Sequence, residues 1–500
     1  MPQNKTFKKN KIAIIGAGPG GLVSAILLAH HGFQVEVFEK NERAGGRNGY
    51  LEFDGFKFDI GPTFFMMDFV LRDIFHELGR NLDDYVKMTK LSPMYRLYFP
   101  DDRQIDVFSE DEKMEQQLKK LFPGDELGLK KFNRREKQRL KKLFPILSHH
   151  NNNILEVFHP RFLSALTSFS VGRSLYDVLG NYFKEELAKL SFTFQAKYLG
   201  MSPWECPGAF AMVPYVEHHN GIWHLEGGLS ASISAMVAVA KELGVKIHYQ
   251  TPVASLLIKN KQVYGVKLTD GVEVLADKVV ANSDFGYTMS NLTPAKNLRK
   301  WSPKKLAKKK LSCSIFMMYL GITGKTDLEH HSIAFARDYK QNVDDIFNGK
   351  LTDEDFSVYV RDAAKTDSTL APAGHSALYV LVPVPNNRSG IDWEKLAPKI
   401  RKQTLAILEE RFKIENISER IVAEKIITPT DWERDYNVYQ GAVFNLSHHL
   451  SQMLWFRPHN RFEELKNLYL TGGGTHPGSG LPTIYQSGKI VADLITKELT

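Results

Sequence analysis

Cysteine is nearly missing from this chain: its 500 residues contain only Cys206 and Cys313. Two thiols are too few for a disulfide framework or a cysteine-rich metal site, and their scarcity is typical of a protein in a reducing compartment. We expect both to be ordinary small interior residues. The histidine pairs at 218–219 and 448–449 are adjacent, so on a strand they would point to opposite faces. We therefore predict no metal.

Long apolar runs are also missing, since no stretch reaches the roughly 20 uninterrupted residues of a membrane-spanning helix. The apolar run at 12–28 follows several lysines, as a secretory signal does, but its glycines break the pattern. We expect a soluble or peripheral protein of the cytoplasm. The net charge of +8 comes without the basic and aromatic pattern of a nucleic-acid module, so we predict no nucleic-acid partner.

The first 50 residues contain a nucleotide-binding pattern. The sequence predicts a buried strand at Lys11–Ile15, a helix at Leu22–His30 and a second strand at Gln34–Glu39. A G-x-G-x-x-G turn joins the first strand to the helix, where free amides favour a pyrophosphate. Glu39 follows at the distance at which a carboxylate accepts hydrogen bonds from ribose hydroxyls. The turn residues predicted to hold the cofactor are Gly16, Ala17, Gly18, Pro19, Gly20 and Gly21.

An acid after the second strand serves the ribose of either NAD or FAD, so the choice depends on the next residues. Glu39 is followed by Lys40 and, five residues on, by Gly45, Gly46 and Arg47. This extension resembles the E-x5-G-G-R segment of the flavoprotein superfamily of amine oxidases and carotenoid desaturases. The resemblance implies that the extension lies along the pyrophosphate of FAD, with Arg47 as a charged contact.

The segment after residue 216 is predicted to return to the nucleotide-binding unit. A helix is expected at Leu229–Leu243, then strands at Val245–Tyr249, Val253–Ile258, Val263–Leu268 and Val274–Val280, with a tight turn at Asp270-Gly271. Asn282-Ser283-Asp284 closes this unit. In the same superfamily such a β-meander follows a G-G-helix, and its residue matching Val253 holds the adenine through the backbone.

The C-terminal end contains a second strand, glycine turn and helix. The strand leads into the glycines of Asn467–Gly474, and a helix is expected at Gln486–Leu499. In FAD enzymes of this architecture, that unit delivers amides to the ribityl chain and the isoalloxazine edge. The residues predicted to do so are Gly473, Gly474, Gly480, Leu481 and Pro482.

The sequence of this segment, GGGTHPGSGLP, resembles the terminal signature of the phytoene-desaturase-type carotenoid desaturases. Within that family it is most similar to the hydroxycarotenoid or methoxycarotenoid branch. Other segments carry the same resemblance along nearly the whole chain: FDIGPT at 58–63, GMSPWECP at 200–207, VEHHNG at 216–221 and RPHN at 457–460. The resemblance adds Gly61, Pro62 and Thr63 to the expected cofactor contacts.

The family implies an enzyme that uses FAD to introduce double bonds into an acyclic C30 or C40 isoprenoid, such as phytoene, neurosporene or a hydroxylated derivative. The family also implies that the enzyme acts at the surface of the cytoplasmic membrane and passes electrons to a quinone or oxygen. The expected fold is α/β: a Rossmann-like FAD-binding domain of the GR2 type at 1–69, 216–285 and 461–500, interleaved with an α+β substrate domain at 70–215 and 286–460 that includes a helical membrane-facing region.

Desaturation removes a hydride and then a proton, and the proton acceptor need not be strong because the cation formed is allylic. Glu217 and His476 are the predicted catalytic residues. Each has a structural alternative: Glu217 with His218 and His219 as satisfied polar residues on a loop or strand beside the pocket, and His476 as a residue that caps a helix or shapes the turn.

Positive charge concentrates in Leu118–Phe144, which reads as a basic amphipathic helix broken once at Pro123-Gly124. Membrane contact and a solvated helix face beside a buried stripe explain it equally well. The following segment, Ile154–Leu166, is predicted to extend an apolar entrance.

Two other functions fit parts of the sequence. A different FAD oxidoreductase of this fold, such as an amine oxidase, a saturase or an isomerase, would keep the cofactor and change the substrate. A non-enzymatic prenyl-binding protein would share the architecture, but its pyrophosphate motifs are eroded in that class, whereas both glycine regions and Arg47 are intact here.

Overall fold

The protein is described here from a computed structural model, which covers residues 10–150, 154–351 and 354–500. The first nine residues of the predicted FAD-binding segment lie outside this description. A five-stranded parallel sheet has the strand order β19-β13-β1-β2-β9. Its strands are β1 (Lys11–Ile15), β2 (Gln34–Phe38), β9 (Lys246–His248), β13 (Lys278–Ala281) and β19 (Leu468–Leu470).

Three helices pack on one apolar face of this sheet, while the other apolar face packs against the strands that contain Val253 and Val263. The helices are α1 (Pro19–His30), α9 (Ser230–Glu242) and α16 (Leu481–Leu499), and all three contribute buried side chains to one core cluster. In the sheet, Ile14 lies between Val37 and Val280, so three distant parts of the chain meet at one register position. The predicted Rossmann-like unit is confirmed, and its first helix begins three residues earlier than the sequence indicated.

The stretch predicted as one strand at 274–280 is two strands in two sheets. Its first part, β12 (Glu273–Leu275), completes a three-stranded antiparallel sheet with β10 (Val253–Lys259) and β11 (Gln262–Leu268). Its second part is β13. The chain changes sheets at Asp277, whose backbone donates to Lys11 O at 2.8 Å while its carboxylate accepts from Lys11 N at 2.7 Å. Apolar residues flank Asp277 and Lys278 on both sides, and this pattern predicted one strand across the change.

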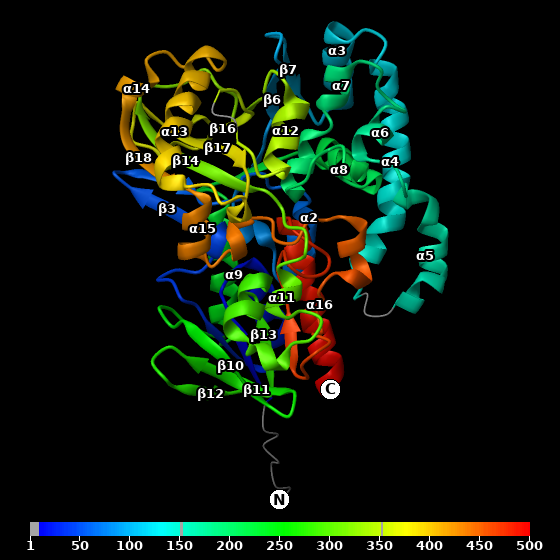
Figure 1. Cartoon of the computed structure of the whole chain (residues 1–500), viewed down its shortest axis with the longest axis vertical. Coiled ribbons are helices and arrows are strands. Elements are labelled where there is room, and N and C mark those ends of the chain that lie inside the picture. Colours follow the sequence, from blue (N-terminus) through cyan, green and yellow to red (C-terminus); the bar gives the residue numbers. More distant parts are fainter. Residues whose placement is uncertain (1–9, 151–153, 352–353) are drawn as a thin grey trace, which may run out of the picture.

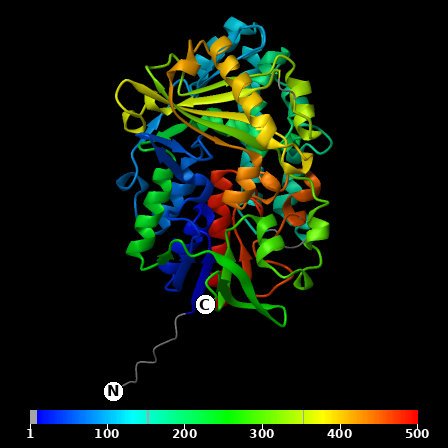
Figure 2. The same cartoon turned by 60° about the vertical axis from the view of Figure 1, so that its left-hand side comes forward.

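A second large sheet lies above the parallel sheet (Figures 1 and 2). Its order is β18-β14-β17-β16-β15-β6-β7. The strands are β6 (Tyr95–Tyr98), β7 (Gln104–Val107), β14 (Ser314–Thr323), β15 (His331–Ala334), β16 (Val358–Asp362), β17 (His375–Val384) and β18 (Ile421–Ile427). The helix α13 (Trp393–Glu410) packs through Trp393, Ile400 and Leu408 in the core cluster that includes Phe316 and Val380. Other side chains of β14, β16 and β17 line the cavity described below.

Helices gather beside the second sheet, at the right of Figure 1. They are α3 (Asp111–Leu121), α4 (Glu126–Leu147), α5 (Pro160–Ala165), α6 (Leu175–Leu179), α7 (Glu186–Leu190) and α8 (Met212–Asn220). The predicted break at Pro123-Gly124 separates α3 from α4. Within α4, Leu129, Phe132 and Leu143 are buried, whereas Lys141 and Lys142 are exposed. None of the helices in the described residues is both long enough and apolar enough to cross a membrane.

Shorter elements connect these layers. The strands are β3 (Tyr50–Phe53), β4 (Phe56–Asp59), β5 (Met88–Lys90) and β8 (Trp223–Leu225), and the helices are α2 (Asp68–Glu77), α10 (Phe285–Tyr287), α11 (Pro303–Leu306), α12 (Tyr339–Phe347), α14 (Ile417–Arg420) and α15 (Pro429–Tyr436). Short 3₁₀ turns that matter below are η3 (Ile154–Phe158), η4 (Leu166–Phe169) and η5 (Phe194–Leu199).

Candidate active site

One cavity of about 500 Å³ runs between the parallel sheet and the second sheet. At one end it is lined by Gly16, Glu39 and Arg47 of the nucleotide-binding pattern. The other end is lined by apolar side chains of the second sheet and the helices, namely Phe64, Met67, Leu140, Phe144, Leu147, Phe194, Leu199, Phe210, Met212, Val213, Val216, Ile333 and Met453. We call these the cofactor half and the apolar half of the cavity.

The glycine turn of the cofactor half is built for close approach. Gly16 has a φ of 90°, a conformation that side chains rarely adopt. A Cβ on Gly21 would lie 2.4 Å from Gly16 O, so only glycine lets α1 pack this closely on β1. Asn282, which follows β13, completes the turn by donating from Nδ2 to Gly16 O at 3.1 Å. The sequence placed Asn282 at the end of its unit but gave no sign of this contact.

Glu39 lies at the end of β2, where its carboxylate faces the cavity. It accepts hydrogen bonds from Ala17 N at 2.8 Å and from Asn41 N at 3.0 Å. These two amides fix the orientation of the carboxylate. Each carboxylate oxygen has a further lone pair, which suits it to the ribose hydroxyls expected here.

Arg47 and Asp284 bring opposite charges to the middle of the cavity. Arg47 donates to the backbone oxygen of Val443, and Asp284 accepts from Asn445 Nδ2 and from Tyr287 N. Burial lowers the pKa of Arg47, opposed by the charge of Asp284; burial likewise raises the pKa of Asp284, opposed by Arg47. An anionic group such as a pyrophosphate would stabilise the guanidinium cation.

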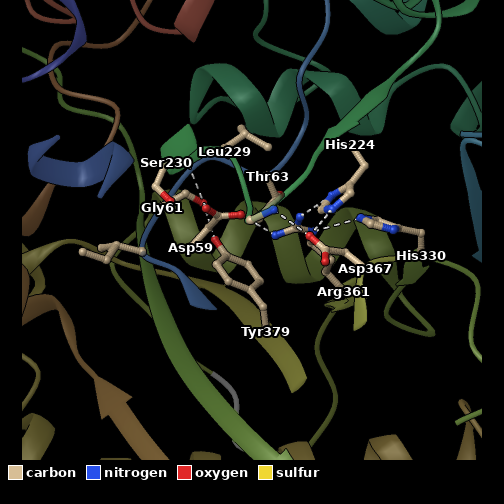
Figure 3. A network of polar contacts seen from close by, with 12 residues as sticks. Asp59, Gly61, Thr63, His224, Leu229, Ser230, His330, Arg361, Asp367 and Tyr379 are labelled. Carbon is tan, nitrogen blue, oxygen red and sulfur yellow. Dashed lines mark hydrogen bonds and ion pairs between the residues drawn. The ribbon is translucent and has the colours of Figure 1, made fainter. Parts of the chain in front are cut away.

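A network of buried polar groups joins β4 to the second sheet, as Figure 3 shows. Arg361 on β16 pairs with Asp59 at 2.6 Å, and each side chain is only 3% exposed. The Arg361 guanidinium also contacts His330 Nε2 and His224 Nδ1, both at 3.1 Å. The second nitrogen of His224 lies 3.0 Å from the Asp367 carboxylate. Asp59 and Arg361 are 302 residues apart in the chain, so this ion pair holds the two halves of the fold together.

Directly after Asp59, three tyrosine hydroxyls of the second sheet hold the segment 60–63. Tyr319 donates to Ile60 O at 2.6 Å, and Tyr379 donates to Gly61 O at 2.6 Å. Tyr359 donates to Thr63 Oγ1 at 2.8 Å. The segment thereby presents Gly61, Pro62 and Thr63 to the cavity.

Arg457 organises the C-terminal glycine loop. It is fully buried, and burial lowers its pKa to about 9. Its guanidinium donates to Gly473 O at 2.6 Å and to Thr475 O at 3.0 Å. The loop so held leads to Gly480, where α16 begins, so the free amides of this helix end point toward the cofactor half.

Most of the predicted cofactor contacts line this one cavity. They are Gly16, Gly18, Pro19, Glu39, Lys40, Gly45, Gly46, Arg47, Gly61, Pro62, Thr63, Val253, Gly473, Gly474, Gly480, Leu481 and Pro482. Ala17, Gly20 and Gly21 do not line it. They act on the turn itself, since Ala17 orients Glu39 and a Cβ on Gly20 would lie 2.6 Å from Thr471 Oγ1.

Neither residue predicted as catalytic lines the cavity. Glu217 lies on α8, not on a loop or strand, and it is fully buried. Its Oε1 accepts from Tyr95 Oη at 2.7 Å and from Gln195 Nε2 at 2.9 Å. This arrangement fits the structural alternative for Glu217, and its catalytic assignment stays a prediction.

His476 is buried beside the cavity, while its neighbours Pro477 and Gly478 line it. Its Nε2 lies 2.7 Å from His149 O, and burial lowers its pKa to about 4. A neutral histidine that contacts a backbone oxygen shapes the loop here, and its catalytic role also stays a prediction. Among the described residues, no group of three or more histidine, cysteine or acidic side chains is placed to hold a metal.

The sequence and the fold of this chain are similar to those of known proteins. The family of flavin containing amine oxidoreductases matches residues 19–496. A 4,4′-diapophytoene desaturase (4,4′-diapolycopene-forming) from Methylomonas sp. is 47% identical over 97% of this chain and 95% of its own length. This chain belongs to the carotenoid desaturases of that family. A zeta-carotene-forming phytoene desaturase from Myxococcus xanthus is 36% identical to this desaturase over 97% of the chain and 93% of the relative.

A solved oxidoreductase from Methanosarcina mazei shares the fold of this desaturase, with a TM-score of 0.65 and 18% identity over 97% of this chain and all of the other. FAD is the cofactor of the family, and the residues of the cofactor half fit it. A Cβ on Gly18 would lie 2.8 Å from Asn282 Nδ2, so the turn leaves its backbone open to a phosphate, and Glu39 and the α16 amides stand at opposite ends of the same lining.

Proposed function

We propose that this desaturase introduces double bonds into an acyclic C30 carotenoid precursor of the 4,4′-diapophytoene type. The 47% identity to the Methylomonas sp. enzyme over nearly the whole length of both chains supports the C30 substrate. The apolar half of the cavity, continuous with the cofactor half, is the single observation that carries the reaction. A hydrocarbon chain there would meet mostly apolar side chains until it reached the cofactor half, with Lys197 as the one amine of that lining among the described residues.

FAD, when bound, accepts the hydride that leaves the substrate. The residues of the chain position the substrate and exclude water from it. Phe194 and Leu199 of η5, together with Met453 from a distant part of the chain, line the apolar half. They can hold a flexible chain with one carbon next to the cofactor half, which reduces the entropy cost of reaching the transition state. The same side chains exclude water from the allylic cation. We further propose that a quinone or oxygen then takes up the electrons.

We also propose that the enzyme docks peripherally on the cytoplasmic membrane through the segment η3-α5-η4, the residues 154–171. Its large apolar side chains point outward: Leu155 is 63% exposed, Phe158 70%, Leu163 51%, Leu166 49% and Val171 75%. Such a contiguous exposed apolar stretch is unusual on a soluble surface. The inner side of this segment packs through Phe162 against Leu143 and Ile146 of α4, whose neighbours Leu140 and Leu147 line the cavity. A lipophilic substrate would thus cross a wall one helix thick.

The apolar residues of 154–171 favour membrane contact, whereas the lysines of α4 favour a helix face exposed to water. Lys141 and Lys142 are exposed opposite a buried stripe, which supports the solvated-face alternative for the basic helix. A flotation assay with anionic liposomes separates the two surfaces. We expect a Phe158→Asp, Leu163→Asp variant to lose most liposome binding, and a Lys141→Glu, Lys142→Glu variant to lose less. Full binding by the aspartate variant would overturn the docking surface.

Pigment analysis tests the reaction. The chain would be expressed in one host that makes 4,4′-diapophytoene and in a second that makes phytoene, with the Gly21→Ala variant as a matched control for cofactor loss. We expect coloured C30 products in the first host and fewer or none in the second. Unchanged precursor in both hosts would refute the desaturase proposal, and products in the second host alone would overturn the C30 substrate.

A further inference from the structure

Lys197 is the one amine that lines the apolar half of the cavity among the described residues. It lies on η5 between Phe194 and Leu199, which line the same wall. Its Nζ is 4.8 Å from the centre of the Tyr339 ring. Within the described part of the chain, it has no carboxylate partner and no hydrogen-bond acceptor. A cation placed so is poorly compensated, since one aromatic face is its main electrostatic partner.

The surroundings set the protonation state of this amine. Burial lowers the pKa of Lys197 to about 7, and the nearby Cys313 acts weakly in the opposite direction. Burial raises the pKa of Cys313 to about 12, so its thiol stays protonated. Burial also raises the pKa of Tyr339, which keeps its phenol neutral. Lys197 therefore exchanges between amine and ammonium near neutral pH, as a proton acceptor must.

The other carboxylates, histidines and cations of the cavity have partners of their own, and burial raises the pKa of its tyrosines, which stay protonated: Tyr287, Tyr359, Tyr379 and Tyr436. Glu39 accepts two backbone amides, and Arg47 and Asp284 face each other in the cofactor half. Lys40 donates to Asp435 O. His448 also lines the cavity, but its Nε2 accepts the hydrogen of Ser479 N at 3.0 Å. Lys197 is left with a lone pair that no described residue uses.

We propose that Lys197 Nζ takes the proton that leaves the substrate during desaturation. The inference rests on the function proposed above. One C–H bond breaks with both electrons going, as hydride, to the oxidised flavin, which leaves an allylic cation. The neighbouring carbon then loses a proton to the neutral Lys197 amine, and the electron pair of that C–H bond becomes the new double bond. The ammonium later returns the proton to water.

Two substitutions separate proton transfer from charge and from packing. Lys197→Met keeps the length of the side chain and removes its nitrogen. Lys197→Arg keeps the cation but cannot give it up at any ordinary pH. Lys189→Met is the matched control, because Lys189 Nζ also lies 4.8 Å from a tyrosine ring, that of Tyr176, but does not line the cavity.

We expect both Lys197 variants to bind FAD and substrate as the parent does, and to lose kcat by about 10²-fold, at the low end for a general base. The kcat of the parent should rise with pH through about 7, where the amine becomes neutral, and both variants should lose this step. Lys189→Met should keep the rate and the step.

A second measurement needs no turnover. Reductive methylation with ¹³C-formaldehyde labels the lysines and also the α-amine, whose ordinary pKa is about 8. Besides the α-amine signal, we expect one dimethylamine NMR signal to titrate near pH 7 in the parent and in Lys189→Met, and to be absent from Lys197→Met. Parent-like kcat and pH dependence in Lys197→Met, while the parent desaturates, would overturn the role of Lys197 alone. So would the same set of titrating signals in the parent and in Lys197→Met. A parent that desaturates neither C30 nor C40 chains would refute both proposals.

Discussion

Loss of one partner of the buried ion pair between Asp59 and Arg361 should destabilise the protein more than loss of one partner of an ion pair on the surface. We consider Asp59→Asn, which keeps the shape of the side chain and an oxygen for the backbone amide of Ser230, now 3.2 Å away. The change leaves a guanidinium that is 3% exposed without its counter-charge. Removal of one partner of a buried pair costs about 3–5 kcal/mol, because the remaining charge cannot reach water.

A second ion pair in the same sheet provides the control. Arg96 on β6 and Asp106 on β7 also lie 2.6 Å apart, but their side chains are 26% and 25% exposed. Water can solvate Arg96 once its partner is neutral, so Asp106→Asn should cost about 1 kcal/mol or less. The two pairs differ in burial and hardly at all in distance, and Arg96 also keeps the carboxylate of Glu329, which lies 3.3 Å from its Nη2.

Urea unfolding followed by tryptophan fluorescence measures both losses on the FAD-loaded protein. The combined Asp59→Asn, Arg361→Met variant should lose less stability than the sum of its two single variants, because no unpaired charge stays buried. Equal losses for Asp59→Asn and Asp106→Asn would refute the argument from burial. So would strictly additive losses in the double variant.

Three further changes test other parts of the structure. Gly21→Ala should abolish FAD retention, because its Cβ would lie 2.4 Å from Gly16 O. The flavin absorbance of the purified protein measures this loss. Gly180→Ala is the control and should keep FAD, because its Cβ would lie 3.4 Å from the nearest atom, Asp177 O. Arg457→Met should lower both Tm and FAD content, since each buried carbonyl left without a donor costs about 1–3 kcal/mol; unchanged FAD content would contradict its role in the glycine loop. For Asp367, burial acts to raise the pKa, but hydrogen bonds led by that from Thr369 lower it to about 2. The folded protein therefore binds a proton at Asp367 less tightly than the unfolded chain does, in which the pKa of an aspartate is about 4. About 2 kcal/mol of stability that is present above pH 4 should be lost as the pH falls toward 2. Asp367→Asn should remove this part of the acid transition.

Most of the residues that local patterns predicted as cofactor contacts line one cavity. The turn at Gly16, the acid at Glu39 and the extension to Arg47 are signals within 37 residues, where short-range sterics and hydrogen bonds decide the structure. The C-terminal loop had its own glycine signal. The resemblance to a known family supplied Gly61 and Val253, which no local pattern would have selected.

The parts that sequence reasoning missed depend on distant contacts. Apolar periodicity could not show that the chain leaves one sheet for another at Asp277, because apolar residues lie on both sides of this position and the pairing partners of β13 are distant in the chain. The residue type of Glu217 predicted a base, and this assignment stays a prediction; no sequence pattern indicated its contacts with Tyr95 and Gln195, which lie 122 and 22 residues away in the chain. Lys197 had no motif at all, and only the fold shows that this lysine lines an apolar cavity.

The contacts of segment 60–63 link the two halves of the cavity physically. Its backbone and side chains reach the cofactor half, yet their hydrogen-bond donors are tyrosines of the second sheet, and Tyr359 and Tyr379 themselves line the cavity. A substrate that packs against these rings therefore contacts the same groups that position Gly61 and Thr63. The Tyr379 hydroxyl is a single donor with Gly61 O as its acceptor, so a shift of its ring must move or break this hydrogen bond. We therefore expect substrate binding and cofactor position to be coupled through Tyr379, and replacement of Tyr379 by Phe to weaken the coupling while leaving the apolar wall intact.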